Sequence, residues 1–241
     1  MAESKGSMIK FASDSAEISG YLVVPKHSGK MPCLIILQEF WGLNDHIKSI
    51  CDRYAKEGFI TLGVDLYSRQ GNKVTTDAQE ASKLMQSMKY DETMKDIKSA
   101  VDYLKALEVS NGKVGCLGFC VGGSYTILSA SKELIDAAFA FYGVMNPTRT
   151  ALGHPVSLID EAQYVSCPLI YVYAEKDAHI SKEQMIDFEE NLKHSEKEFE
   201  VVRIPDADHA FFNDTRPEVY NKQRAEEMYR KSVEFFKKHL Q

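Results

Sequence analysis

Seven apolar runs alternate along the chain with segments of helical period. These runs cover residues 18–25, 33–40, 59–66, 113–119, 137–143, 168–175 and 199–205. Most of them lack the alternation of apolar and polar residues that a strand with one solvated face shows, which is typical of strands buried on both faces. We therefore predict a mostly parallel β-sheet.

Helical patterns fill several of the gaps between these runs. Residues 45–57 have a helical period with Asp45 as the expected N-cap, and residues 218–240 repeat apolar residues at similar intervals. The many Lys and Glu residues of the second segment predict a solvated helix face.

A third helix is predicted over residues 181–193, where Ser181 and Gln184 have the spacing of a capping box. Strands and helices in alternation, with right-handed crossovers, indicate a doubly wound sheet flanked by helices. We expect one domain over residues 1–241. Residues 144–165 lack a clear period and are long for a loop, so we expect a lid or a pocket wall there.

Composition excludes several classes of function. The 241 residues are 44% hydrophobic, which suffices for one large core. The 35 acidic and 29 basic residues give a net charge of −6, with both signs interspersed, so the chain is not expected to bind nucleic acid or an anionic membrane. No stretch approaches the ~18 consecutive apolar residues that a membrane span requires.

The cysteines indicate in which cellular compartment the protein is expected. Five are present, without a CxxC pair beside a histidine cluster, and an odd number cannot be fully paired. Neither a zinc site nor a disulfide framework is therefore expected, and we predict no metal and no cofactor. Free thiols and an N-terminus without a signal-peptide core predict a cytoplasmic protein.

One cysteine has a setting of its own. In the sequence GFCVG, Cys120 stands between Gly118 and Gly122, after a predicted strand and before the helical run SYTILSA. This is the context of a nucleophile elbow, whose central residue has a strained backbone and whose glycines avoid collisions. A thiolate there gains from the helix dipole. The alternative is a buried structural cysteine in a glycine-rich turn.

A nucleophile of this kind needs an acid and a histidine further along the chain. Asp177 follows one predicted strand and His209 follows the next, in that order after Cys120. Ligands gather at such carboxyl ends of strands in open α/β sheets. Asp208 is an alternative partner for the histidine, and His179 is an alternative base.

These residues lie in blocks that together resemble dienelactone hydrolase, the carboxymethylenebutenolidase family of α/β-hydrolases. The blocks are LQEFWGLND, VDLYSRQG, NGKVGCLGFCVGG, FYGV and DADHAF, and the likeness covers almost the whole chain. The resemblance implies an α/β-hydrolase fold with Cys120 as the nucleophile, His209 as the base and Asp177 as its orienting acid.

Further roles follow from the resemblance. Glu39 matches a family glutamate that lies near the nucleophile and helps to generate the thiolate when substrate binds; the alternative is an exposed strand-end carboxylate. The backbone N–H groups of Phe40 and Val121 are expected to form the oxyanion hole. Tyr142, in the FYGV block, is expected to contact the substrate.

The residues that bind the substrate in this family are not the same in this sequence. The family's dienelactone enzymes hold a substrate carboxylate with two arginines and a tyrosine, but the matching positions here are Ala78, Ser82 and Asn213. We expect Asn213 and Arg69 near the substrate instead. The cations that are candidates to replace the missing clamp, although each also suits a solvated surface, are Arg69, Lys73, Lys83, Arg149 and Arg216.

The leading hypothesis is hydrolysis of small esters or lactones through a covalent acyl-cysteine. One alternative is another acyl transfer, such as thioester cleavage. A second alternative is a catalytically silent α/β-hydrolase fold that binds a small ligand or a partner protein. The expected partner is a small-molecule substrate, and the sequence does not predict an oligomeric state.

Overall fold

The computed structural model describes residues 6–26, 28–145 and 157–241, and its centre is one eight-stranded sheet. The strand order across the sheet is β1-β2-β4-β3-β5-β6-β7-β8. The strands are β1 (Ser7–Ser13), β2 (Ala16–Val23), β3 (Met31–Leu37), β4 (Ile60–Val64), β5 (Ser110–Phe119), β6 (Ala137–Phe141), β7 (Leu169–Ala174) and β8 (Phe199–Ile204).

The sheet is mostly parallel, as predicted. Strands β1 and β2 pair antiparallel, and β2 also pairs antiparallel with β4, whereas every later pairing is parallel. All residues of β3, β4, β6 and β7 are buried. This two-sided burial is the reason why these runs lack alternation.

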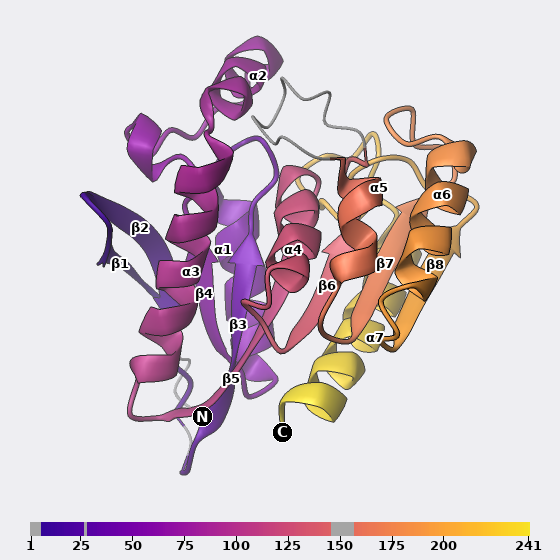
Figure 1. Cartoon of the computed structure of the whole chain (residues 1–241). Coiled ribbons are helices and arrows are strands. Elements are labelled where there is room, and N and C mark those ends of the chain that lie inside the picture. Colours follow the sequence, from indigo (N-terminus) through magenta and orange to yellow (C-terminus); the bar gives the residue numbers. More distant parts are fainter. Residues whose placement is uncertain (1–5, 27, 146–156) are drawn as a thin grey trace.

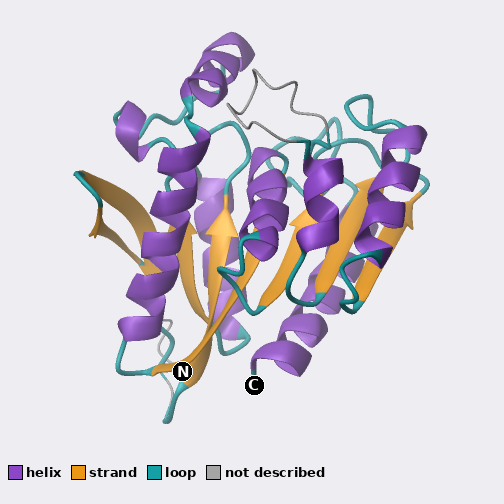
Figure 2. Ribbon diagram, in the orientation of Figure 1, coloured by secondary structure: helices purple, strands orange, loops and turns teal. Residues whose placement is uncertain are grey.

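Helices cover both faces of the sheet. In Figure 1, helices α3, α4, α5 and α6 lie in front of it, and α1 and α7 lie behind; Figure 2 shows the strands between these two layers. The α-helices are α1 (Asp45–Lys56), α2 (Ala78–Ser87), α3 (Tyr90–Ala106), α4 (Val121–Ser131), α5 (Leu158–Glu161), α6 (Lys182–Lys193) and α7 (Lys222–Leu240), and the 3-10 helices are η1 (Ser68–Gln70) and η2 (Ala162–Tyr164). The doubly wound architecture is thereby confirmed.

The N-terminal boundary of α1 differs from the prediction. Asn44, not Asp45, is the N-cap of α1, because its side chain accepts a hydrogen bond from the N–H of Ile47 at 3.1 Å. The capping box of Ser181 and Gln184 at the start of α6 is confirmed.

The region 144–165 is not a loop throughout. It contains α5 and η2, while residues 146–156, and with them most of the expected lid, lie outside the described residues.

Aromatic side chains tie the central strands to the helices behind them. The rings of Phe119 on β5 and Phe141 on β6 stack with centroids 4.9 Å apart, and Phe139 packs on Phe236 of α7 at 6.2 Å. Each fully buried aromatic ring stabilises the fold by about 1.5–3 kcal/mol relative to exposure. The sheet is therefore a rigid platform, and its carboxyl edge, at the upper side of Figure 2, carries the polar residues discussed next.

Candidate active site

Cys120 occupies a strained turn between β5 and α4. Its backbone has φ 54° and ψ −117°, a region that residues with a side chain rarely adopt. The turn is fixed from both sides, because the Cys120 N–H donates to the Phe141 carbonyl at 3.0 Å and the Gly122 N–H donates to the Gln38 carbonyl at 3.1 Å. A Cβ at Gly122 would lie 2.5 Å from the Leu37 carbonyl oxygen, so glycine is required there.

Asp177 and His209 meet although they follow different strands. The Nδ1 of His209 lies 2.6 Å from Oδ2 of Asp177, and the Asp177 side chain is fully buried. The other carboxylate oxygen accepts a hydrogen bond from the N–H of His179 at 2.8 Å. Asp208 is exposed instead, so the structure pairs the histidine with Asp177. The ring of His179 packs edge-on against His209 with centroids 5.0 Å apart.

Cys120 also interacts with the His209 ring. Burial alone lowers the pKa of His209, but the charge of Cys120, hydrogen bonds to Asp177 and Cys120, and the charge of Asp177 together raise that pKa from 6.5 to about 10. The ring is therefore protonated at neutral pH. A hydrogen-bonded imidazolium therefore stands beside the sulfur of the candidate nucleophile.

Glu39 is buried, with 3% of its surface exposed, so the alternative of an exposed strand-end carboxylate is wrong. One carboxylate oxygen accepts from the Tyr142 hydroxyl at 3.1 Å and the other from Nδ2 of Asn213 at 2.6 Å. Burial, followed by the nearby charges of Glu39 and Cys120, raises the pKa of Tyr142 well above its ordinary value, so its hydroxyl remains a donor. The carboxylate is thus held by two neutral donors.

The orientation of Asn213 is fixed by its neighbours. Its side-chain oxygen accepts hydrogen bonds from the N–H of Thr215 at 3.0 Å and from the Thr215 hydroxyl at 2.7 Å. The amide nitrogen must then face Glu39. Sequence reasoning missed Thr215, and no motif pointed to it.

The two residues expected to form the oxyanion hole, Phe40 and Val121, follow the neighbouring strands β3 and β5. Within the described ranges, neither Phe40 nor Val121 donates its N–H to a backbone carbonyl, and Val121 opens α4, where an N–H has no partner in its own helix. The hydroxyl of Tyr67 donates to the Phe40 carbonyl at 2.9 Å and so fixes that residue. Sequence reasoning did not assign Tyr67, although it lies in the VDLYSRQG block.

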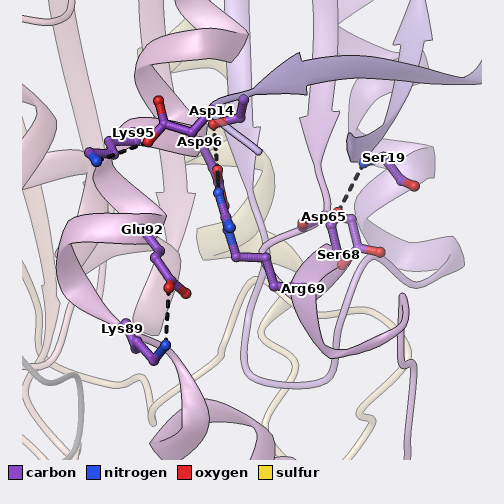
Figure 3. Close-up of polar contacts among 10 residues, drawn as sticks. Asp14, Ser19, Asp65, Ser68, Arg69, Lys89, Glu92, Lys95 and Asp96 are labelled. Carbon is purple, nitrogen blue, oxygen red and sulfur yellow. Dashed lines mark hydrogen bonds and ion pairs between the residues drawn. The ribbon is translucent and has the colours of Figure 1, made fainter. Parts of the chain in front are cut away.

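Arg69 requires a correction. Its Nε and one terminal nitrogen each lie 2.8 Å from a carboxylate oxygen of Asp96 on α3, and Ser13 of β1 donates to the same carboxylate at 2.6 Å. Figure 3 shows the Arg69 guanidinium directed at Asp96. Arg69 therefore joins η1 to α3 and β1, and the substrate-binding role expected for it is not supported.

A cavity of about 310 Å³ adjoins the site through Asn213. Among the cations considered as replacements for the missing clamp, Arg216 lines this cavity, 5.8 Å above the Trp41 ring, and pairs with Glu218 at 2.9 Å. Arg149 lies outside the described residues, and Lys73 and Lys83 are exposed. Other residues of the wall are Asn44, Thr75, Thr76 and Thr215.

Two kinds of feature are absent from the described residues. In the ranges 6–26, 28–145 and 157–241, no helix combines the length and apolarity needed to cross a bilayer. Over the same residues, no three His, Cys, Asp or Glu side chains converge in a way that would hold a metal ion.

The sheet, its helical layers and the strained turn after β5 define the chain as an α/β-hydrolase. Residues 18–240 match the family model of the Dienelactone hydrolase family, and the chain belongs to this family. The resemblance seen in the sequence is thereby confirmed, and with it the assignment as a hydrolase of esters or lactones.

Individual relatives cover nearly the whole chain. Protein usf of Aquifex pyrophilus is 33% identical, and a protein of Aquifex aeolicus provisionally named carboxymethylenebutenolidase is 31% identical; each match covers 98% of this chain and 99% of the relative. A solved structure from Klebsiella pneumoniae, provisionally described as a dienelactone hydrolase, has a TM-score of 0.89 and 26% identity, covering 97% of this chain and 98% of that one. The dienelactone hydrolase-like promiscuous phosphotriesterase P91 from metagenomic libraries shares the fold, with a TM-score of 0.86, 20% identity and full coverage of both chains.

Proposed function

We propose that this chain hydrolyses small esters or lactones through Cys120, with His209 as proton carrier and Asp177 as its orienting acid. The observation that carries this proposal is the hydrogen-bonded series from the buried Asp177 carboxylate through the His209 ring to the Cys120 sulfur. A binding protein would have no need for a protonated imidazole beside a thiol at a strained turn.

In the first step the Cys120 thiolate adds to the substrate carbonyl. The resulting oxyanion accepts hydrogen bonds from the N–H groups of Phe40 and Val121. His209 then donates its proton to the departing alkoxide, so an alcohol leaves and the acyl group remains on sulfur. For a lactone, the alcohol and the acyl group are parts of one bound chain.

In the second step His209, now neutral, takes a proton from water. The hydroxide formed in this way attacks the thioester carbonyl, and the collapse of the intermediate releases the acid and the thiolate, while His209 keeps its proton. Throughout, Asp177 holds Nδ1 of the ring, so that the other ring nitrogen exchanges protons with the reactants.

Glu39 is proposed to take part in activation of the thiol, as the resemblance implies. Its two oxygens accept hydrogen bonds from Tyr142 and Asn213 in this structure, so its approach to the sulfur requires one of those bonds to open. Tyr142 and Asn213 are proposed to adjoin the substrate from this side.

The cavity next to Asn213 is proposed to receive part of the substrate. Of the lining side chains within the described part of the chain, Arg216 is the one that is positive, and it already pairs with Glu218; the amide of Asn213 is neutral. We therefore propose that uncharged esters or lactones are preferred, because a buried substrate carboxylate without a cation is costly. The chain is further proposed to be one domain and cytoplasmic, where its five thiols stay free.

A substrate panel tests the proposal. Small lactones, p-nitrophenyl esters and thioesters are offered to the wild type, to Cys120→Ala and to the matched control Cys116→Ala, which removes a buried thiol of β5. Turnover should be lost with Cys120→Ala and kept with the control. Activity that survives the loss of Cys120 undiminished would remove the nucleophile from the proposal, and faster turnover of thioesters would favour thioester cleavage as the function.

A further inference from the structure

Besides the bond from Asn213 to Glu39, a second contact joins the chain near Glu39 to the loop after His209, and none of the proposed catalytic residues takes part in it. His46, in the first turn of α1, lies with Nδ1 2.8 Å from Oδ1 of Asp214, and 3% of the His46 side chain is exposed. The two residues are 168 positions apart in the sequence. His46 therefore connects α1 to the loop that follows His209.

This contact has a feature that packing does not explain. The Nε2 atom of His46 is buried and has no hydrogen-bond partner among the described residues. A buried polar atom without a partner destabilises the fold, whereas an apolar side chain would fill the same space without that cost. Nδ1 faces a carboxylate and so carries the proton, which leaves Nε2 as the unpaired atom.

The neighbours of the pair are functional residues on both sides. His46 follows the turn that carries Glu39 and Phe40, and Asn44 of that turn caps α1. Asp214 stands next to Asn213, whose Nδ2 donates to Glu39 at 2.6 Å. The His46–Asp214 pair and the Asn213–Glu39 bond are thus two bridges between the same two segments.

The His46–Asp214 pair fixes the distance between the loop after His209 and Glu39, which hydrogen bonds within the loop do not fix. Asp214 is largely exposed, and the Asn213 backbone is held within its own loop by bonds from Asn213 N–H to Ala210 and from Arg216 N–H to Asn213. These bonds set the shape of the loop, and the rings of Phe211 and Phe212, packed on Tyr142 and Phe141, hold the side of the loop before Asn213 against the sheet. Neither set of contacts holds the side after Asn213 at a fixed distance from Glu39. His46, anchored in a helix, supplies a fixed point for that distance.

We propose that His46 and Asp214 are positioning residues that hold the loop after His209 against the turn of Glu39. The pair keeps the Asn213 amide on Glu39 and thereby keeps that carboxylate in place. This inference rests on the proposed function only for its kinetic readout. A displacement of about 1 Å in such a setting costs up to about 100-fold in rate.

The test uses variants of both partners. His46→Leu and Asp214→Ala break the contact, whereas His46→Asn retains a donor near the position of Nδ1 and Asp214→Asn retains an acceptor. Asp45→Ala, at an exposed carboxylate of the same helical turn that contacts Lys48, is the matched control. Each protein is assayed for kcat and KM with p-nitrophenyl acetate and for its melting temperature.

We expect kcat to fall by about 10-fold in His46→Leu and in Asp214→Ala, with KM within twofold. The double variant should lose no more than either single one, because both break one contact. The retaining variants should recover most of the rate. Multiplicative losses, or retaining variants as slow as the breaking ones, overturn the proposal.

A second readout does not depend on activity. In the wild type, the side-chain NH₂ signals of Asn213 should be slow to exchange with solvent in NMR spectra, since that group is buried on Glu39. In His46→Leu they should exchange faster, while Asp45→Ala leaves them unchanged. Unchanged exchange in His46→Leu overturns the inference even if the wild type hydrolyses no ester, an outcome that would refute the proposed function alone.

Discussion

The charge state of His209 gives the sharpest test of the active site. Its pKa is raised from 6.5 to about 10, and because each pKa unit corresponds to ~1.36 kcal/mol, the site favours the protonated ring by roughly 5 kcal/mol. The largest contribution in this direction is the charge of Cys120. Replacement of that cysteine by alanine removes the charge and a hydrogen bond, but leaves Asp177 at 2.6 Å.

We therefore expect the pKa of His209 to fall by more than about 1 unit in Cys120→Ala, because burial then opposes protonation with only Asp177 against it. The measurement is an NMR titration of the ring signals between about pH 5 and 11. Cys116→Ala, which removes a buried thiol from the strand that leads to the turn, is the control and should leave this pKa unchanged. An unchanged pKa in Cys120→Ala would mean that the sulfur carries no charge at rest, and the resting ion pair would be refuted.

Four further outcomes are expected. Brief treatment with iodoacetamide followed by mass spectrometry should label Cys120 before the four buried thiols, which are those of Cys33, Cys51, Cys116 and Cys167. Burial raises the pKa values of these four thiols, to about 12 for Cys116 and Cys167, and so slows their alkylation. Faster labelling of any one of the four would contradict the assignment of Cys120. Glu39→Gln should lower kcat with little change in melting temperature, because a glutamine can still bond Tyr142 and Asn213, whereas equal rates would leave Glu39 a structural role. Among matched substrates, kcat/KM should be higher for the uncharged member than for the carboxylate; the reverse order, abolished by Arg216→Gln, would identify Arg216 as a replacement cation. Gly122→Ala should lower the free energy of unfolding in urea by more than about 2 kcal/mol, since the new Cβ meets a carbonyl oxygen of the backbone at 2.5 Å, and a loss below about 1 kcal/mol would show that the turn relaxes.

Much of the sheet was predictable because its strands are buried on both faces. Runs such as residues 33–40 and 168–175 consist almost wholly of apolar residues, and no other environment suits them as well. Strand β1 was missed, because it is an edge strand with four exposed residues and only Phe11 and Ser13 buried. Helix α3 was not predicted either, although its buried residues Met94, Ile97 and Val101 have a helical spacing that a longer window would have revealed.

In the candidate site, too, some residues could be predicted from the sequence and others could not. The order of Cys120, Asp177 and His209 along the chain, each after a predicted strand, was enough to bring them together, because parallel strands end at one edge. Contacts between remote loops carry no such signal. The partner of Arg69 on α3 and the approach of His46 to Asp214 depend on how helices and loops pack, and neither residue stands in a pattern that names its partner.

The positive φ of Cys120 links reactivity to fold stability. At φ 54° and ψ −117° the backbone has a conformation that glycine adopts readily and other residues adopt at a cost of about 1–3 kcal/mol. A chain with glycine at this position would relieve the strain and fold more securely, but it would have no sulfur. Selection for thermal resistance and selection for chemistry therefore oppose one another at this residue, and stabilised variants of this protein are best sought elsewhere in the chain.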